Sequence, residues 1–488
     1  MTQPAANPIR RPISLCAILS VLCLLTAAAV RLAGMNCQLW LDEIWSIRLA
    51  QTAGSPLGIL LLHHDNNHWL NTFADYLLGP GRPWWAYHVL PEVTGIGAVL
   101  LGWLIARRRG EWQGFAALVL LGGSEFLIEY SSDARGYAPL GFFALLCVWL
   151  LDQHLARPRR WTVALMSASA ALAILSHLTS IAILAGLIAA SALSLFRRRR
   201  SWPAAISHTA LWWAVPVATL TILYVIDIRF MIRGGGPPTP ADLPGQTAAM
   251  LLGFPLDSRA APIFGIAAFL LCAIQIGRLY CAADPEWPVF LSAALFVPVV
   301  LFCLPRTIYL HPRYIYVAAP FILILCGMEL GRWLASGGWR AGLSSVVLLA
   351  FVGVNAGPIS TFLFLGRGDY VGAVNFILDQ TVTQDVVVGA DRHPTSTLMV
   401  LEYYTQYHVH TPHRIETFNN LVGGDQWPQW LVTEENVGQA LQSSTGAVFV
   451  RRATFPDGAV TSGIPWIIYE AESGAARARP ENLRALAR

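Results

Sequence analysis

Long apolar runs separated by short polar stretches dominate the sequence from about residue 13 to residue 362. A run of about 20 apolar residues is the length that an α-helix needs to cross the hydrocarbon core of a bilayer. We therefore predict an α-helical polytopic membrane protein with about eleven transmembrane helices. Their expected positions are 13–33, 84–106, 112–130, 136–155, 161–177, 179–196, 206–226, 262–280, 287–304, 315–334 and 342–362.

The stretch 161–196 is apolar over most of its length and allows two interpretations, two closely spaced helices or one long interrupted helix. Arginines stand at both ends of the stretch, at Arg159-Arg160 and at residues 197–200. Positive charge concentrates in cytoplasmic loops. Clusters at both ends favour two helices, with His177 at the turn between them.

The pattern changes after residue 362, where helix-like and strand-like segments alternate. We predict a transmembrane domain at 1–362 and a small C-terminal α/β domain at 363–488. Its expected elements are helices at 370–380 and 395–407 and strands at 385–388, 447–451 and 464–470. The domain contains no recognisable catalytic motif, so a lid, an acceptor platform and a purely stabilising domain all remain open.

The placement of the charges indicates orientation better than the net charge of +4 does. The arginines of the short loops gather on one side of the predicted helices. They are Arg10, Arg11, Arg107, Arg108, Arg109, Arg157, Arg159, Arg160, Arg197, Arg198, Arg199, Arg200, Arg278, Arg332 and Arg340. This side is predicted to be cytoplasmic. The amino terminus would then be cytoplasmic, and the first long loop (34–83) and the C-terminal domain would lie on the outer side of the membrane.

Composition agrees with a membrane protein. Hydrophobic residues make up 55% of the chain and charged residues 13%, whereas soluble domains carry about 25% charged residues. Most of the eight cysteines lie within apolar runs. Neither a disulfide framework nor a cysteine metal cluster is expected.

The first candidate chemistry is the acidic pair Asp42-Glu43, which follows the first predicted span. Neighbouring side chains on a helix point about 100° apart. We therefore expect one carboxylate to face a cavity and the other to cap, pair or meet water. The alternative is an interfacial helix anchored by Trp40 and Trp45, with its acids in the headgroup layer.

The second candidate lies in the stretch HHDNNHWLNT. His64, His68 and Asp65 have types and spacing that could hold zinc, and a polar loop without a ligand is another interpretation. Mixed donors and acceptors are typical of sites for hydroxyl-rich ligands, and this interpretation, contact with a sugar or a lipid phosphate, fits best. The residues that supply them are Asn66, Asn67, His68 and Asn71.

Arginines at the heads of later spans form the third group. Arg135 and Arg313 stand where predicted helices re-enter the membrane, and Arg306 is a further candidate. A guanidinium group suits phosphate, although Arg135 could instead pair with Asp133. A lone histidine such as His177 is more often a packing residue than a catalyst.

These elements, in this order, resemble those of the bacterial membrane glycosyltransferases of the GT-C fold. That group includes the protein O-mannosyltransferases and the aminoarabinose transferase of lipid A, and the chain looks similar to glycosyltransferase family 39. The resemblance covers roughly residues 10–365. The elements are Trp40-Leu41-Asp42-Glu43, Asn66-Asn67-His68-Trp69-Leu70-Asn71, Tyr130 to Tyr137, Ser176 to Ser180, and Arg313-Tyr314 followed by Pro320.

The resemblance implies an inverting transfer from a polyprenyl-phosphate sugar donor to a lipid, glycan or protein acceptor, with membrane lipids around the protein. It implies no cofactor, no metal ion and no nucleic acid. Asp42, with Glu43 beside it, would be catalytic, and Arg135 and Arg313 would bind the donor phosphate. The expected sugar or acceptor contacts are Asn66, Asn67, His68, Asn71, Tyr137 and His177.

Two positions depart from the pattern of the family. Trp69 stands where relatives often have proline, and His88 stands where they often have an arginine. A phosphate contact through His88 would depend on protonation of the imidazole. Either change could alter the donor, the acceptor or the activity.

Two other functions fit a chain of this kind, namely a transporter or flippase of a polyprenyl-linked glycan and a non-catalytic relative of the enzyme. A transporter is expected to place charged groups along a mid-membrane pathway. Here the polar groups concentrate at span ends on one side, which favours an enzyme at the membrane surface.

Overall fold

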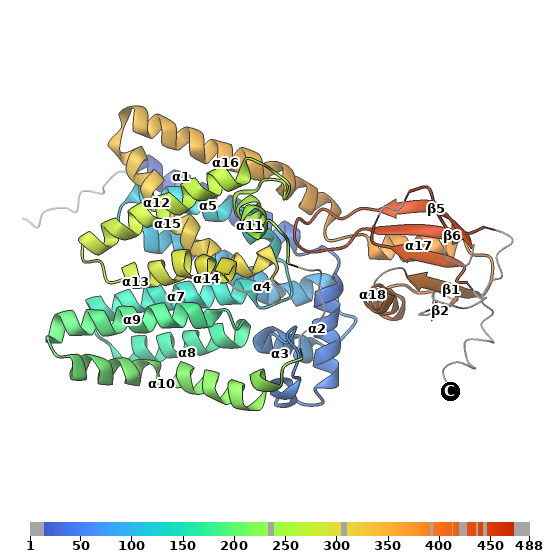
Figure 1. Cartoon of the computed structure of the whole chain (residues 1–488), viewed down its shortest axis with the longest axis horizontal. Coiled ribbons are helices and arrows are strands. Elements are labelled where there is room, and N and C mark those ends of the chain that lie inside the picture. The colour runs from blue at the N-terminus through green and yellow to red at the C-terminus, as the bar shows by residue number, and fades with distance from the viewer. Residues whose placement is uncertain are drawn as a thin grey trace, which may run out of the picture.

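The computed structural model describes residues 14–232, 239–303, 310–390, 394–411, 413–418, 427–435, 438–442 and 447–472. The molecule has two parts, a large bundle of helices and a small β-sheet with two helices (Figure 1). Helix α16 (Gly338–Leu365) runs along the bundle and leads into the part that contains the sheet.

Eight helices in the described part of the chain are long and apolar enough to cross a membrane. Leu349, on α16, is 72% exposed, and apolar side chains of this kind face lipid in a polytopic protein. The chain is a multi-pass membrane protein. The other seven helices are α1 (Leu15–Gly34), α4 (Trp84–Arg107), α7 (Tyr137–Ala156), α9 (Ser180–Arg199), α10 (Trp202–Ile226), α12 (Ala261–Cys281) and α15 (Ala319–Ser336).

Two predicted spans are shorter helices. The stretch 161–196 forms two helices, α8 (Arg160–Ser176) and α9, so the prediction of two segments is confirmed and His177 lies at the turn between them. The predicted span 287–304 is made of three pieces joined end to end. They are α13 (Trp287–Phe290), the π-helical turn η3 (Leu291–Phe296) and α14 (Val297–Cys303).

The span predicted at 112–130 is broken into α5 (Glu111–Gly122) and α6 (Glu125–Ser131), which meet at 63°. A helix end leaves backbone carbonyl groups without partners, which is costly where water is excluded. The buried guanidinium of Arg31, on α1, donates to the carbonyl oxygens of Leu121 at 3.0 Å and Gly122 at 3.3 Å. Because this partner lies about 90 residues earlier in the chain, the local pattern predicted one straight span.

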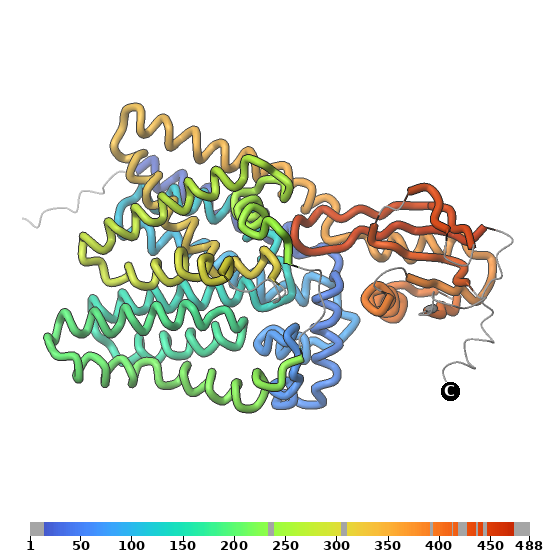
Figure 2. Tube along the Cα trace, in the orientation of Figure 1, coloured from blue at the N-terminus to red at the C-terminus, as the bar shows by residue number. Residues whose placement is uncertain are grey.

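Short elements gather at the end of the bundle that faces the sheet, as the trace in Figure 2 shows for α2 and α3. They come from the loops between long helices and supply the polar residues discussed below. They are α2 (Leu41–Thr52), η1 (Gly58–Leu61), α3 (Trp69–Leu78), η2 (Ile228–Phe230), α11 (Leu243–Leu252) and η4 (Pro312–Val317).

The C-terminal part contains a six-stranded mixed sheet with strand order β2-β1-β3-β6-β5-β4. β1 (Asp385–Ala390) is parallel to β2 (Arg414–Phe418) and β3 (Trp430–Thr433). The other neighbours are antiparallel and involve β4 (Ala440–Gln442), β5 (Val448–Phe455) and β6 (Trp466–Ala471).

Helices α17 (Tyr370–Asp379) and α18 (Pro394–Tyr407) pack with this sheet, and the side chains of Trp430 and Trp466 are buried in its core. The prediction of a small α/β unit is therefore confirmed. The sequence had indicated both helices and β1, β5 and β6. It missed β2, β3 and β4, which are five residues or fewer in length.

Candidate functional site

Asp42 lies in the first turn of α2 and contacts two arginines that come from distant parts of the chain. Its Oδ2 atom is 2.7 Å from an amino nitrogen of Arg135 and 2.9 Å from an amino nitrogen of Arg313. Arg135 belongs to the turn before α7, and Arg313 belongs to η4. The structure thus brings together three residues that the sequence had singled out separately.

The charge balance around Asp42 keeps its carboxylate ionised. Burial alone would raise the pKa of Asp42, but the guanidinium groups of Arg135 and Arg313 outweigh it and hold the pKa below its ordinary value. A carboxylate in this state is a weak base. Asp42 can accept a proton efficiently only when another anion takes over its arginine partners.

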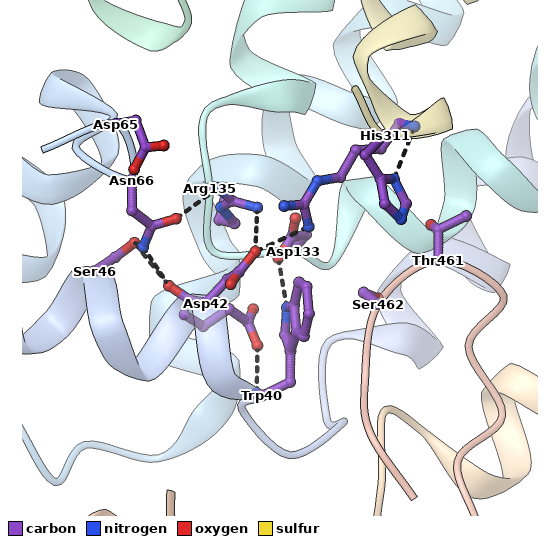
Figure 3. A network of polar contacts seen from close by, with 12 residues as sticks. Trp40, Asp42, Ser46, Asp65, Asn66, Asp133, Arg135, His311, Thr461 and Ser462 are labelled. Atoms are coloured by element: carbon purple, nitrogen blue, oxygen red, sulfur yellow. Dashed lines mark hydrogen bonds and ion pairs between the residues drawn. The ribbon is translucent and has the colours of Figure 1, made fainter. Parts of the chain in front are cut away.

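Asn66 holds this group in place from the first long loop. Its Oδ1 atom accepts a hydrogen bond of 2.6 Å from Arg135, and its Nδ2 donates to the backbone oxygen of Asp42 at 2.9 Å and to Ser46 Oγ at 3.2 Å. Figure 3 shows Asp42, Ser46, Asn66 and Arg135 converging. Ser46 was not predicted, since a serine on a short helix carries no signal of its own.

A pocket of about 840 Å³, a volume that includes its open mouth, lies over these residues. Its wall is formed by most of the predicted site residues together with residues that sequence reasoning had not assigned. The described residues that line it are Asp42, Trp45, His64, Asp65, Asn66, Asn67, His68, Trp69, Arg135, Tyr137, His177, Leu178, Met231, Arg313 and Tyr314.

The pocket wall includes three rings in contact. The ring centroid of His177 is 4.9 Å from that of His68 and 4.9 Å from that of Tyr137. Burial lowers the pKa of His68 well below its usual range, and burial with the nearby arginines lowers the pKa of His177 to about 3. The two imidazoles are therefore uncharged at neutral pH, in contrast to the guanidinium groups of Arg135 and Arg313.

Glu43 and His88 are not among the described residues that line the pocket, and this revises both predictions. Both side chains are fully buried, with Glu43 Oε1 2.9 Å from His88 Nε2. His88 Nδ1 lies 2.7 Å from the backbone oxygen of Met35. With both ring nitrogens engaged, His88 cannot reach a phosphate. His88 instead pairs with Glu43.

Glu43 acts on the protein rather than on a ligand. Its Oε2 atom accepts from the backbone N–H of Trp40 at 3.0 Å, and its Oε1 accepts from that of Ala134 at 2.6 Å. The first contact caps the start of α2. The second holds the turn that presents Arg135. The expectation that only one carboxylate of the pair faces a cavity is thus met, and Asp42 is that carboxylate.

Asn71 also lies outside the described lining of the pocket. Its Nδ2 donates to the backbone oxygen of Ala134 and to Asp75 Oδ2, the latter at 3.1 Å. Asn71 therefore supports the same turn as Glu43 and is not a sugar contact in this structure. Asn67, which does line the pocket, donates to the backbone oxygen of Ile59 at 2.7 Å.

The sequence had left open that Arg135 pairs with Asp133, two residues earlier. In the structure Arg135 instead contacts Asp42 and Asn66. The Oδ1 atom of Asp133 accepts from Trp40 Nε1 at 3.1 Å, and burial, with the nearby Glu43 charge second, raises the pKa of Asp133 to about 6. Trp40 is itself only 6% exposed. It is a packing residue that positions Asp133, rather than an anchor in the headgroup layer.

The zinc interpretation of the histidine-rich stretch finds no support in the described residues, where no group of three His, Cys, Asp or Glu side chains is placed to hold a metal ion. His64 Nδ1 instead accepts from the backbone N–H of Asn66 at 3.0 Å. Arg306, the further phosphate candidate, lies outside the described residues.

A second buried polar cluster joins the C-terminal part to the bundle, and sequence reasoning missed it. Arg367 is fully buried and donates to the backbone oxygens of Glu129 at 2.6 Å and Ser132 at 2.8 Å and to Ser462 Oγ at 2.8 Å. The carboxylate of Glu129 accepts from Ser462 Oγ at 2.6 Å and from Thr461 Oγ1 at 2.8 Å.

We call this the Glu129–Arg367 clamp, made of Glu129, Arg367, Thr461 and Ser462. Figure 3 shows Thr461 and Ser462 on a loop that approaches the network around Asp42. This loop joins β5 and β6. The clamp therefore ties the sheet to the turn that precedes Asp133 and Arg135.

Comparison by sequence found no matching family model and no matching curated protein. Comparison of structures found ArnT from Cupriavidus metallidurans in the apo state, with a TM-score of 0.52, 12% identity, and coverage of 96% of this chain and 100% of that chain. The chain has the GT-C fold. This confirms the fold expected from the ordered polar elements, at an identity too low for a family assignment by sequence.

Two further structures resemble the chain less closely. ArnT from Cupriavidus metallidurans bound to undecaprenyl phosphate gives a TM-score of 0.47 and 14% identity, covering 94% of this chain and 99% of that one. The archaeal oligosaccharyltransferase AglB from Archaeoglobus fulgidus, in complex with an inhibitory peptide and a dolichol-phosphate, gives a TM-score of 0.47 and 11% identity. It covers 86% of this chain and 69% of that chain.

Proposed function

We propose that this protein is an inverting glycosyltransferase that moves a sugar from a polyprenyl-phosphate donor to an acceptor hydroxyl. The observation that carries the proposal is the contact of one partly buried carboxylate, Asp42, with two arginines inside a pocket. A base beside a pair of phosphate ligands is the inventory that such a reaction requires. The GT-C fold supports the same class of reaction.

The first step is an exchange of partners at the arginines. A donor phosphate that enters the pocket competes with Asp42 for Arg135 and Arg313, since guanidinium groups bind phosphate oxygens in the same forked manner as carboxylates. As the arginines turn to the phosphate, Asp42 loses the contacts that lower its pKa. Binding of the donor thereby converts Asp42 from a weak base into a stronger one.

The second step is a single displacement. The acceptor hydroxyl transfers its proton to Asp42, and its oxygen forms a bond to the anomeric carbon of the sugar. The bond between that carbon and the phosphate oxygen breaks, and its electron pair leaves with the polyprenyl phosphate. Arg135 and Arg313 stabilise the negative charge that develops there. One displacement inverts the anomeric centre.

The position of the pocket suits a lipid-linked donor. Its lining includes Asp42 on α2, which follows α1, and Arg313 on η4, which leads into α15. A polyprenyl chain can remain in the bilayer while its phosphate reaches the arginines. The acceptor is a lipid, a glycan or a protein.

We further propose that the pocket faces the periplasm of a bacterial inner membrane, with the amino terminus cytoplasmic. The arrangement of the arginines in the short loops supports this orientation. The same proposal divides the chain into a transmembrane domain at 1–362 and a periplasmic domain at 363–488. Helix α16 continues to Leu365, just beyond that boundary.

The test is incubation of the purified protein, in lipid nanodiscs, with a panel of labelled polyprenyl-phosphate sugars, scored for release of polyprenyl phosphate. We expect consumption of at least one donor by the wild type and a loss of consumption in Asp42→Asn. A wild-type protein that neither consumes a donor nor binds undecaprenyl phosphate would overturn the proposal.

A further inference from the structure

His68 and His177 lie side by side in the pocket but are fixed in opposite tautomers. His68 Nδ1 is 3.1 Å from the backbone oxygen of Ser176. A carbonyl oxygen only accepts hydrogen bonds, so Nδ1 of His68 carries the hydrogen and Nε2 presents a lone pair.

The opposite holds for His177. Its Nδ1 atom is 3.2 Å from the backbone nitrogen of Thr179 and 2.9 Å from the hydroxyl oxygen of that residue. A backbone N–H only donates, so Nδ1 of His177 is the acceptor and Nε2 carries the hydrogen. The two rings therefore offer the pocket one acceptor and one donor, with centroids 4.9 Å apart.

Both imidazoles keep these tautomers at neutral pH, because burial and the arginine charges lower the pKa of each ring below its usual range. His68 cannot become a cation that would attract a phosphate or a carboxylate. The three rings of His68, His177 and Tyr137, which we call the neutral end of the pocket, are uncharged, whereas Arg135 and Arg313 carry positive charge.

Two polar atoms at the neutral end are buried without a hydrogen-bond partner in the described part of the chain. They are His68 Nε2 and the hydroxyl oxygen of Tyr137. Both side chains are at least nine-tenths buried, and both residues line the pocket. Buried polar atoms are almost always paired in folded proteins, so these atoms indicate the place of a ligand group.

The absence of a side chain at Gly136 allows the contact between His68 Nδ1 and the backbone oxygen of Ser176. A Cβ atom at that position would lie 1.7 Å from the backbone oxygen of Ser176 and 3.0 Å from His68 Nδ1. Only glycine lets the Ser176 carbonyl approach closely enough to fix the tautomer of His68. The acceptor in the pocket thus depends on a residue that does not touch the pocket itself.

We infer that the neutral end binds hydroxyl groups of the transferred sugar, with His68 Nε2 as acceptor and His177 Nε2 as donor, and that this sugar is neutral. The inference rests on the proposed function and deepens it. A hydroxyl group can donate to one imidazole and accept from the other. A carboxylate has no hydrogen to give to His68 Nε2, whereas a hydroxyl group has one, so a uronic acid carboxylate at this position leaves the acceptor unsatisfied.

The same contrast orients the donor. Its phosphate lies against Arg135 and Arg313, and its sugar extends toward His68 and His177. Tyr137 contacts both groups, because its ring packs against His177 and the guanidinium carbon of Arg135 lies over the same ring, 5.3 Å from its centroid.

The experiment measures binding in nanodiscs to three probes. They are undecaprenyl phosphate alone, a panel of undecaprenyl-phosphate neutral hexoses and pentoses, and undecaprenyl-phosphate glucuronic acid. We expect at least one neutral sugar to bind about tenfold more tightly than undecaprenyl phosphate alone, the gain of one or two good hydrogen bonds. The glucuronic acid donor should show no such gain.

His68→Phe keeps a ring and removes the acceptor, so it should abolish the gain while binding of undecaprenyl phosphate alone stays unchanged. His177→Phe should reduce the gain in the same selective way. His413→Phe, in the C-terminal part, is the matched control and should behave as wild type. Retained binding of undecaprenyl phosphate shows that a variant is folded.

A gain that survives in His68→Phe, a wild type in which no sugar adds affinity, or a preference for the glucuronic acid donor would overturn the inference while leaving the proposed function in place. Failure of the wild type to bind undecaprenyl phosphate would instead refute the proposed function, and the inference would fall with it.

Discussion

Asp42 and Arg313 are 271 residues apart in the chain, yet their carboxylate and guanidinium groups lie 2.9 Å apart. Arg135 contacts the same carboxylate oxygen from a third segment. A carboxylate held by two arginines is well suited to exchange them for a phosphate. The predictions below follow from that exchange and from the clamp that supports it.

Replacing Asp42 with asparagine should separate donor binding from transfer. The side chain keeps its size but loses the base, so turnover should fall by about 10²- to 10⁴-fold. Undecaprenyl phosphate should bind at least as tightly as to the wild type, because Arg135 and Arg313 no longer have a competing anion. Parallel measurements of binding and turnover check this. Near-normal turnover would remove Asp42 from the role of base.

Replacing Arg135 with alanine should weaken binding of the lipid phosphate by about 10- to 100-fold, which corresponds to loss of one charge-assisted contact. Arg135→Lys should have an intermediate effect, because it keeps the charge and loses the fork. Arg452→Ala, which removes an exposed ion pair with Glu470, is the control. Equal affinity for undecaprenyl phosphate in wild type and Arg135→Ala would count against phosphate binding by Arg135.

The pH dependence should differ between the free enzyme and the donor complex. In the free enzyme Arg135 and Arg313 hold the pKa of Asp42 below its ordinary value. The kcat/KM profile should therefore show no acid limb from Asp42 above about pH 4. In the donor complex the arginines bind phosphate, so the acid limb of kcat should lie at higher pH. Coincident limbs would contradict the exchange of partners.

The lowered pKa of Asp42 should also make the stability of the folded protein depend on pH. The folded-state pKa of Asp42 is lowered, so its ion pairs stabilise the fold above the unfolded-state value of about 3.9. That contribution is lost as the pH falls through the lower folded-state pKa. Thermal unfolding should show a difference between wild type and Asp42→Asn at pH 5 to 8 that shrinks below about pH 4. A difference in thermal stability between wild type and Asp42→Asn that increases as the pH falls would contradict this prediction.

Removal of Arg367 should destabilise the junction between the bundle and the sheet. Arg367→Ala leaves two backbone oxygens and the Glu129 carboxylate without a buried cation nearby, at a cost of about 3 kcal/mol. The apparent melting temperature should fall by several degrees, whereas Arg452→Ala should change it little. Unaltered melting of Arg367→Ala would show that the clamp does not hold the two parts together.

Chelation should leave the reaction unchanged. Arg135 and Arg313 already supply the positive charge that a divalent ion would bring to the leaving phosphate. We expect turnover in excess EDTA to equal turnover in buffer. Loss of activity on chelation, with recovery when a divalent ion is returned, would show that a metal ion is needed.

The sequence predicted the helical framework and the main members of the site, because both depend on local patterns. Apolar runs gave the spans, and charged residues at span ends gave Asp42, Arg135 and Arg313. Their mutual contact required the fold. The sequence could not show that Glu43 and His88 pair with each other, because they are 45 residues apart. Glu43 was predicted to be catalytic and His88 to bind phosphate.

Long-range partners also explain what was missed. The break between α5 and α6 depends on Arg31, and the clamp depends on Arg367 and on a loop more than 300 residues after Glu129. Each of these side chains resembles an ordinary charged residue in its own segment. Only the approach of the second segment gives it a role.

The clamp also has a consequence for the order in which the protein is made. Glu129 lies early in the chain, and its side chain is buried in the folded protein. The residues that donate hydrogen bonds to its carboxylate, Thr461 and Ser462, are synthesised more than 300 residues later. Until then the turn that carries Arg135 lacks one of its supports. A chain released before this point would lack the hydroxyl groups that bind Glu129, so its candidate site would form without this support.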